Sequence, residues 1–229
     1  IVVAVNKIDK YGADPDRVAL LDNFSWGDPR RPSTLGELVM AVEGCCGAAR
    51  MYNAPFVSGK DSLNNEYVGS DGQRHAVPPT LVITAIAHAP DADHCITPDL
   101  AAPGNVLLLI GGTVTEFAGS HLDMVCGAPS RPGVAPAPVP DAPADYRHLH
   151  AAIRAGLIES CHDVSEGGLA VTLAEMCIGG RLGATIDTLP HDDLATAMFA
   201  ESCGRLVVEV QPARVAEFLK VMDNRATRI

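Results

Sequence analysis

The sequence predicts a mixed α/β (α+β) protein built from two consecutive domains. Short apolar runs of strand length, such as Thr80–His88 and Asn105–Ile110, alternate along the chain with segments of helical periodicity. A turn-rich stretch, Ala89–Pro103, separates these two runs and is the best candidate for a domain boundary. We therefore expect one α/β domain in residues 1–95 and a second in residues 96–229.

The composition narrows the class of protein. A chain of 229 residues with 47% apolar and 20% charged residues is typical of a soluble globular protein. Its net charge of −11 disfavours a surface that binds nucleic acid or an anionic membrane. The longest apolar runs, such as Val106–Ile110, have the length of strands, so the sequence predicts no membrane span. Nucleotides stay possible ligands, because backbone amides and Mg²⁺ can neutralise phosphates locally.

The cysteines are scattered and form no C-x-x-C pair. This pattern favours reduced thiols in a cytoplasmic protein over a disulfide framework or a zinc site. We expect most of them to be small core residues. The seven are Cys45, Cys46, Cys95, Cys126, Cys161, Cys177 and Cys203.

The first residues indicate a longer protein. The chain begins with Ile1 instead of Met, inside an apolar run that extends to Val5. We therefore expect this sequence to be a piece of a longer polypeptide.

In the first domain, an apolar strand brings two polar residues to its end. The strand covers Arg17–Phe24 and delivers Asp22 and Asn23 at its C-terminal end. Ser33 or Thr34 is then expected to cap a helix. That helix extends from about Leu35 to Tyr52, with a predicted apolar stripe of Leu38, Val42, Cys45, Cys46 and Ala49.

The rest of the first domain is predicted to be strand and turn. A short strand enters a polar loop within Ala54–Leu63, and Asp71–Gly72 is typical of a hairpin turn. A longer strand follows at Thr80–His88.

The second domain repeats the alternation of strands and helices. Its predicted elements are a strand at Asn105–Ile110, an extended proline-rich loop at Val134–Pro143, a helix at Tyr146–Gly156, a strand at about Leu182–Asp187, a short helix near Asp192–Phe199, a strand at Gly204–Val210 and a helix from Pro212 to about Met222.

Between these elements, Cys161–Ala170 predicts a strand, a tight turn and the start of a helix. Such a turn leaves backbone N–H groups at the positive end of the helix dipole, which suits a phosphate group. The carboxylate of Asp163 is placed to hold the Mg²⁺ that accompanies phosphates. The alternative is a capped helix after a strand, with glycines that serve only close packing.

Three loops share one format, in which a strand ends in an acid or amide and small polar residues follow. They begin at Asp22, Ser58 and His162. A nucleotide–Mg²⁺ site needs acids for the metal, and backbone N–H groups and a lysine for the phosphates. The three loops together contain these parts, although strand-ending Asp and Asn residues also cap turns.

Several familiar motifs are excluded. Gly59–Lys60 lacks the spacing of a Walker loop, and Gly111–Gly112 lacks the Rossmann fingerprint. Cys161, His162 and Asp163 are the residue types of a catalytic triad. Because consecutive strand residues point to opposite faces, they cannot act together as nucleophile, base and orienting acid.

Three other features have two interpretations each. Glu201 and Arg205 form either a structural ion pair, which we favour, or a ligand contact. Thr115–His121 is either a substrate loop or simple turn chemistry. Trp26 is more consistent with packing than with stacking on a ligand.

Four ordered motifs resemble phosphoribosylformylglycinamidine synthase, the synthetase subunit of purine biosynthesis. The resemblance covers nearly the whole chain but only the C-terminal half of that enzyme. The motifs are Leu21–Pro29, Ser58–Tyr67, Glu116–Ser120 and His162–Leu169.

This resemblance implies a PurM-like fold, with an N-terminal-type domain followed by a C-terminal-type domain. It implies an ATP-dependent ligase that converts formylglycinamide ribonucleotide, glutamine-derived ammonia and ATP to formylglycinamidine ribonucleotide, ADP and phosphate. The implied partners are a glutaminase subunit, a small bridging subunit and the missing N-terminal half. The family's catalytic histidines lie in that missing half, so no catalytic residue is expected here.

The resemblance also assigns roles to individual residues. It places ATP against Asp22, Gly59 and Ser165, substrate against Ser62, and Mg²⁺ on Asp163. Some relatives have a metal-binding asparagine at the position of Lys60. Since an ammonium group cannot ligate Mg²⁺, we expect Lys60 to meet phosphate instead. Asn6 is a weaker match to another ligand, because the acid expected four residues earlier is Val2.

Two alternatives remain open. In the first, the loops of this chain complete the ATP and substrate site of the ligase together with the missing half. In the second, the chain is a non-catalytic, nucleotide-binding half that holds the assembly together. A related enzyme, such as aminoimidazole ribonucleotide synthetase, is a further alternative that the motif wording disfavours.

Overall fold

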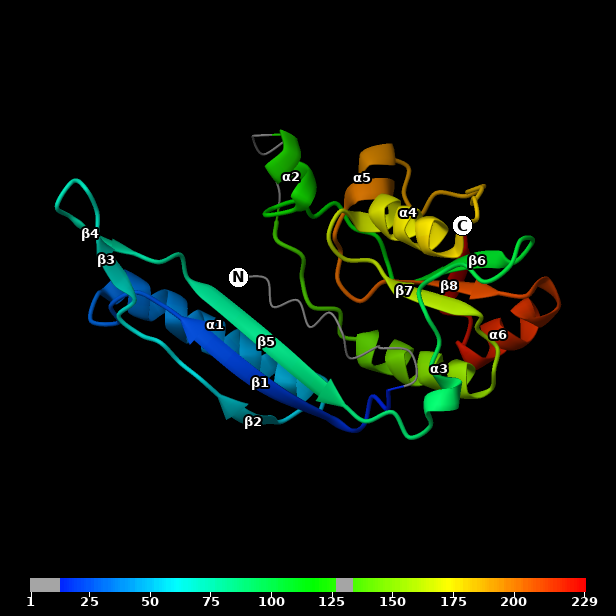
Figure 1. The fold of residues 1–229 in the computed structure, drawn as a ribbon, viewed down its shortest axis with the longest axis horizontal. Coiled ribbons are helices and arrows are strands. Elements are labelled where there is room, and N and C mark those ends of the chain that lie inside the picture. Colours follow the sequence, from blue (N-terminus) through cyan, green and yellow to red (C-terminus); the bar gives the residue numbers. More distant parts are fainter. Residues whose placement is uncertain (1–12, 127–133) are drawn as a thin grey trace. The chain divides into compact units, whose positions relative to one another are not determined.

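A computed structural model describes residues 13–126 and 134–229 and divides them into two compact units (Figure 1). Of these residues, unit 1 contains 16–88, and unit 2 contains 13–15, 89–126 and 134–229. The opening apolar run and Asn6 lie outside the described residues.

Unit 1 packs one long helix against a three-stranded sheet. The strand order is β2-β1-β5, with β1 parallel to β2 and antiparallel to β5. A small antiparallel hairpin of β3 and β4 turns at Gly72, whose φ is 73°, so the predicted hairpin is confirmed. The elements are β1 (Val18–Ser25), α1 (Pro32–Met51), β2 (Phe56–Gly59), β3 (Glu66–Val68), β4 (Arg74–Ala76) and β5 (Thr80–Ala87).

The predicted cap of α1 is wrong. The helix begins at Pro32, its N-cap is Arg31, and no side chain caps it. Proline suits this position because its fixed φ starts a helix and its missing N–H would be unpaired there anyway. The helix therefore begins before Ser33 and Thr34.

The apolar stripe of α1 is only partly as predicted. Ala41 and Cys45 are its buried residues, whereas Val42 is 43% exposed and Cys46 is also exposed. The buried face packs on the sheet with Phe24 and the fully buried Trp26. Trp26 is thus a packing residue, as predicted.

The other face of this sheet carries exposed apolar side chains. Along β5, exposed and half-buried residues alternate, which is the period of a strand covered on one side. Val82 and Ile86 are 53% and 57% exposed, whereas Ile83 and Ala85 pack on the core.

Unit 2 is a four-stranded antiparallel sheet with helices on both sides (Figure 1). Its strand order is β7-β8-β6-β9, with α4 and α5 on one side in the figure and α3 and α6 on the other. The elements are η1 (Ala92–His94), β6 (Val106–Ile110), α2 (His121–Cys126), α3 (Ala142–Arg154), β7 (Ser160–Asp163), α4 (Gly168–Gly180), α5 (Leu194–Phe199), β8 (Leu206–Val210), η2 (Pro212–Arg214), α6 (Val215–Val221) and β9 (Ala226–Arg228).

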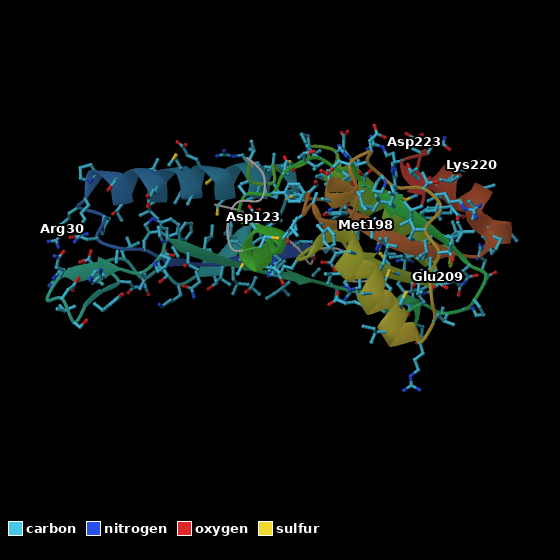
Figure 2. All side chains as sticks on the ribbon, turned by 90° about the horizontal axis from the view of Figure 1, so that it is seen from above. Arg30, Asp123, Met198, Glu209, Lys220 and Asp223 are labelled. Carbon is cyan, nitrogen blue, oxygen red and sulfur yellow. The ribbon has the colours of Figure 1, made fainter. Side chains whose placement is uncertain are left out.

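Figure 2 labels Glu209, a charged residue on β8. Its exposed fraction is only 1%, so it lies in the interior of unit 2. Four donors satisfy its carboxylate: Ala101 N at 2.7 Å, Ala102 N at 3.1 Å, Asn105 Nδ2 at 2.8 Å and Ser160 Oγ at 2.7 Å. A buried carboxylate with full hydrogen bonding fixes the loop before β6 to the sheet.

One predicted strand is wrong. Leu182–Asp187 is irregular, because Arg181 ends α4 in the left-handed conformation and Leu182 N bonds back to Cys177 O. Leu182 and Ile186 nevertheless pack on the core, which explains their apolar pattern. The sheet edge beside β6 is occupied by β9, which the sequence pattern did not indicate.

The cysteine prediction is half right. All seven are free thiols, but only Cys45 and Cys161 are buried, while Cys46, Cys95 and Cys126 are exposed. Most cysteines are therefore not core residues.

No helix in the described residues combines the length and apolar character that a membrane span requires.

Candidate functional site

In unit 1, the parallel pairing of β1 and β2 brings two predicted loops together. Asp22 stands opposite Gly59 in the register. Lys60 N donates to Asp22 O at 3.0 Å, and Ser62 N donates to Phe24 O at 2.8 Å. Because parallel strands present their carboxyl ends at the same edge, residues 37 and more positions apart form one surface.

Gly59 is required by its neighbour across the strands. A Cβ at this position would lie 2.7 Å from Cγ of Asp22, which is shorter than van der Waals contact. The carboxyl group of Asp22 therefore lies against the bare backbone of Gly59, and both residues belong to one arrangement.

Asp22 has a second carboxyl group beside it. Partial burial, followed by the hydrogen bond and the negative charge of Asp61, raises the pKa of Asp22. Asp61 Oδ1 also accepts from Phe24 N at 3.4 Å. A cation or hydrogen-bond donor placed here would relieve the repulsion between the two acids.

Lys60 and Ser62 lie side by side in the same loop. The Lys60 ammonium group donates to Ser62 Oγ, so the structure joins the residue predicted for phosphate to the residue predicted for substrate. Lys60 is exposed, and its charge faces the solvent from which a phosphate would arrive.

Two polar residues of this region were missed by the sequence analysis. Asn65 Nδ2 donates to Ser25 Oγ at 2.8 Å. The side chain of Glu66 is 3% exposed and pairs with Arg31 at 3.1 Å and Arg74 at 3.6 Å. Their position within the Ser58–Tyr67 motif was the signal that could have found them.

In unit 2, Asp163 ends β7 as predicted, and Ser165 Oγ donates to its Oδ2. Burial acts to raise the pKa of Asp163, but hydrogen bonds from His162 and Ser165 and the nearby imidazole charge outweigh it, so the pKa is lowered. The carboxylate is therefore held in its charged form, which is the form that binds a cation.

The turn after Asp163 differs from an open phosphate cradle. Gly167 N donates to Glu201 Oε1 at 2.8 Å, and Gly168 N donates to Ser165 O at 3.0 Å. The sequence predicted unpaired backbone N–H groups in this turn, but those of Gly167 and Gly168 are paired. The partner of Gly167, Glu201, lies 34 positions away along the chain, and the partner of Gly168 lies within the turn. The two glycines also serve packing: a Cβ on Gly168 would lie 2.7 Å from the backbone oxygens of Met198 and Ala200.

The structure also excludes a triad of Cys161, His162 and Asp163, but not because strand residues alternate between faces. His162 Nδ1 lies 3.5 Å from Asp163 Oδ1 and His162 Nε2 lies 3.1 Å from Glu175 Oε2, so the histidine and the acid do interact. Strand alternation fails at the last residues of a strand, where the backbone turns. Cys161, however, is fully buried and unavailable as a nucleophile.

Glu201 and Arg205 do not use each other as hydrogen-bond partners. The Arg205 guanidinium donates to Thr113 Oγ1 at 3.0 Å, to Ser202 O at 3.2 Å and to Ala200 O. Burial lowers the pKa of Arg205 to about 10, although Arg205 stays charged at neutral pH. Instead of the predicted ion pair, Glu201 binds the backbone N–H groups of Gly167 and His121, and Arg205 binds Thr113 and the backbone oxygens of Ala200 and Ser202.

A cavity of about 290 Å³ lies elsewhere in unit 2. Glu209, Asp187 and Arg228 are among the residues that line it. None of the residues predicted for ATP, substrate or metal lines this cavity.

In the part of the chain that the structure describes, no three His, Cys, Asp or Glu side chains gather as a metal site. This is compatible with Mg²⁺, which commonly takes one or two carboxylates and completes its shell with phosphate oxygens and water. Asp163 with the Ser165 hydroxyl fits that donor set, whereas Lys60 does not.

Comparison with known proteins gives the family. Residues 102–229 match the family described as AIR synthase related protein, C-terminal domain. The chain belongs to this family. The expected mixed α/β fold of PurM-like type is confirmed.

The curated relatives agree with the resemblance seen in the motifs. The chain is 34% identical over 231 residues to phosphoribosylformylglycinamidine synthase subunit PurL of Lactobacillus helveticus, with 100% of this chain and 30% of the relative covered. It is 36% identical over 210 residues to the PurL subunit of Chelativorans sp., with 89% and 27% covered. The chain thus spans about 30% of the length of these relatives.

Solved structures agree on the fold. Thermotoga maritima PurL complexed with FGAR aligns with a TM-score of 0.69 at 16% identity, with 98% of this chain and 37% of that chain covered. The hydrogenase maturation protein HypE in complex with ATP aligns with a TM-score of 0.68 at 20% identity, with 99% and 67% covered.

Proposed function

We propose that this chain is part of an ATP-dependent ligase of purine biosynthesis. The ligase converts formylglycinamide ribonucleotide, glutamine-derived ammonia and ATP to formylglycinamidine ribonucleotide, ADP and phosphate. Identity of 34% to a PurL subunit along the whole chain supports this proposal. The complexes of Thermotoga maritima PurL with ATP and with FGAR support the choice of ligands.

The geometry that carries the proposal is the parallel pairing of Asp22 with Gly59 in unit 1. It gathers Asp22, Gly59 and Lys60, which we assign to ATP, with Ser62, which we assign to the substrate. In the reaction, ATP activates the amide oxygen as an iminophosphate, and ammonia displaces phosphate. An ammonium group such as Lys60 stabilises the charge on phosphate oxygens throughout these steps.

In unit 2 we assign Asp163 to Mg²⁺ and Ser165 to the nucleotide. The lowered pKa of Asp163 supports the first assignment, since it keeps the carboxylate charged. Bound Mg²⁺ would neutralise phosphate charge.

We assign residues 1–95 to a PurM N-terminal-type domain and residues 96–229 to a C-terminal-type domain. The catalytic base is assigned to the remainder of the longer protein. The exposed apolar face around Val82 and Ile86 supports contact with that remainder, because large exposed apolar patches mark interaction sites.

The proposed assembly also contains a glutaminase subunit and a small bridging subunit. The related structure described as PurLQS from Thermotoga maritima supports a complex of several subunits. The proposed location is the cytoplasm, where free thiols such as those of this chain persist.

A second candidate is a non-catalytic half whose nucleotide site is structural. Two features favour it. The family resemblance implies a metal-binding asparagine in some relatives where this chain has Lys60, and Glu201 already accepts a hydrogen bond from the N–H of Gly167. An activity like that of aminoimidazole ribonucleotide synthetase stays a weaker alternative.

Calorimetric titration with ATP–Mg²⁺ tests the proposal, first on this chain and then on its Asp163→Asn variant. We expect binding that the substitution weakens. No binding by the unsubstituted chain would refute a nucleotide site in it, and equal affinity of both would remove Asp163 from the metal. Ligase activity with ammonia is to be assayed on the full-length protein, and we expect none from this chain alone.

A further inference from the structure

Glu201 is the only residue between α5 and β8 whose side chain is bonded to two separate helix starts in the described structure. Its Oε1 accepts from Gly167 N, before α4, at 2.8 Å and from His121 N, the first residue of α2, at 2.9 Å. His121 Nδ1 lies 3.3 Å from the same oxygen. The Glu201 side chain is only 15% exposed.

The two partners belong to the two motif loops of unit 2. Gly167 closes the turn that carries Asp163 and Ser165. His121 follows the Glu116–Ser120 motif. One carboxylate oxygen therefore ties both loops, which are more than 40 residues apart along the chain.

Residues next to Glu201 in the sequence also bind the loop that precedes α2. Ser202 Oγ accepts from Val114 N at 3.0 Å and donates to Val114 O at 3.1 Å. Arg205 reaches Thr113 Oγ1 at 3.0 Å. The segment from Glu201 to Arg205 thus fixes one loop at three points. It also supports the Asp163 turn twice, because Glu201 accepts from Gly167 N and Arg205 O accepts from Val164 N at 2.9 Å.

The turn needs such support. Gly167 and Gly168 both have positive φ, at 82° and 69°, and consecutive glycines give a backbone many alternative conformations. A hydrogen bond from a backbone N–H to a charged carboxylate is stronger than one between neutral groups. At this place the positive end of the α4 dipole strengthens it further.

We infer that Glu201 is a positioning residue, which fixes the Gly167 turn against the Glu116–Ser120 loop so that Asp163 and Ser165 face the nucleotide and its cation. This inference rests on the proposed function. Glu201 acts through the backbone N–H of Gly167 and touches neither ligand itself.

The test compares Glu201→Gln with Glu201→Ala in the full-length protein, with ATP–Mg²⁺ affinity measured by calorimetry. Glutamine keeps an acceptor oxygen for Gly167 and His121, whereas alanine removes it. We expect Glu201→Ala to weaken binding by about tenfold or more, as loss of a supporting partner typically does, and Glu201→Gln to restore most of it. Glu159→Ala is the matched control, because it removes a half-buried carboxylate that bonds only Gln211 Nε2 among the described contacts.

Amide hydrogen exchange supplies a readout that needs no ligand. Faster exchange at Gly167 and His121 in the alanine variant, with the sheet amides unchanged, is the expected result. Unchanged exchange at both amides would overturn the inference even if the protein binds ATP.

Three affinity results would also overturn it. Equal weakening by glutamine and alanine would mean that binding needs the negative charge at this position and that an acceptor oxygen alone does not suffice. Tighter binding in both variants would mean that the carboxylate competes with phosphate. Unchanged affinity in the alanine variant would leave Glu201 a purely structural role. Absence of ATP binding by the unsubstituted protein would instead refute the proposed function, and the positioning role with it.

Discussion

Asp22 in unit 1 and Asp163 in unit 2 both end a strand and precede a small polar loop, but their surroundings differ. Partial burial, followed by the presence of a second acid, Asp61, raises the pKa of Asp22. Asp163 receives hydrogen bonds from Ser165 and His162, and its pKa is lowered. The same local pattern thus gives one carboxyl group that resists ionisation and one that favours it, because burial and the groups beside each carboxyl group decide its charge.

The glycines beside the two acids differ in the same way. Gly59 lies against a side chain, that of Asp22, whereas Gly168 lies against the backbone oxygens of Met198 and Ala200. A side chain can rotate away from an added methyl group, but backbone between α5 and β8 cannot shift without moving the sheet. Unit 2 therefore holds its turn more rigidly than unit 1 holds its loop.

The largest expected effect is that of Gly168→Ala. A strained positive φ together with overpacking against backbone is expected to lower the free energy of unfolding by about 2–4 kcal/mol. Gly59→Ala is expected to cost about 1 kcal/mol, since Asp22 can rotate. Denaturant titration of both variants checks the difference.

Gly44→Ala is the control for these variants. Gly44 lies inside α1 with nothing within 4 Å of an added Cβ, so alanine is expected to stabilise unit 1 by up to about 1 kcal/mol. Equal losses in Gly168→Ala and Gly59→Ala would contradict the difference in rigidity.

Asp163→Asn has the next effect. Removal of the charge weakens the hydrogen bonds from Ser165 and His162, so stability is expected to fall by about 1–2 kcal/mol in the absence of nucleotide. Thermal unfolding of the ligand-free protein is the measurement. A variant as stable as the parent protein would show that these hydrogen bonds contribute little.

Lys60→Ala tests the ligand side of unit 1. If the ammonium group meets phosphate, ATP affinity should fall about tenfold, which corresponds to about 1.4 kcal/mol. Stability should stay nearly constant, because Lys60 is exposed. Arg50→Ala, at the far end of α1, is the control for loss of an exposed positive charge.

The smallest expected effect has the opposite sign. Because the folded-state pKa of Asp22 is raised, its contribution to stability is present below the ordinary pKa of 3.8 and is lost as pH rises through the raised value. Asp22→Asn should therefore stabilise the protein at neutral pH, by less than about 1 kcal/mol because solvent screens a partly exposed pair. The gain in stability should vanish below the ordinary pKa of Asp22. Unfolding measured across roughly pH 3–7, a range that extends from about one unit below that pKa to about three units above it, tests both statements.

The sequence predicted much of the fold because period and turn chemistry are local properties. The strand at Thr80–His88, the hairpin turn at Gly72 and the strand–turn–helix at Asp163 all follow from residues within a few positions of one another. The predicted strand at Leu182–Asp187 was wrong because an apolar pattern records burial, and irregular backbone can also bury side chains. The cap of α1 was wrong because Pro32 starts the helix before the expected residues.

The sequence by itself determined the fold class, the family resemblance and the identity of the strand-ending acids. Only the tertiary structure decided that Asp61 lies beside Asp22 and that Glu201 accepts from Gly167 N. Ser165 and His162, in contrast, are sequence neighbours of Asp163. The partners of Glu201 lie 34 and 80 positions away along the chain. Charge and hydrogen bonding act through space over a few ångströms. Strand pairing therefore sets the surroundings of Asp22, whereas residues next to Asp163 in the sequence set its charge and loop packing adds Glu201 to its turn.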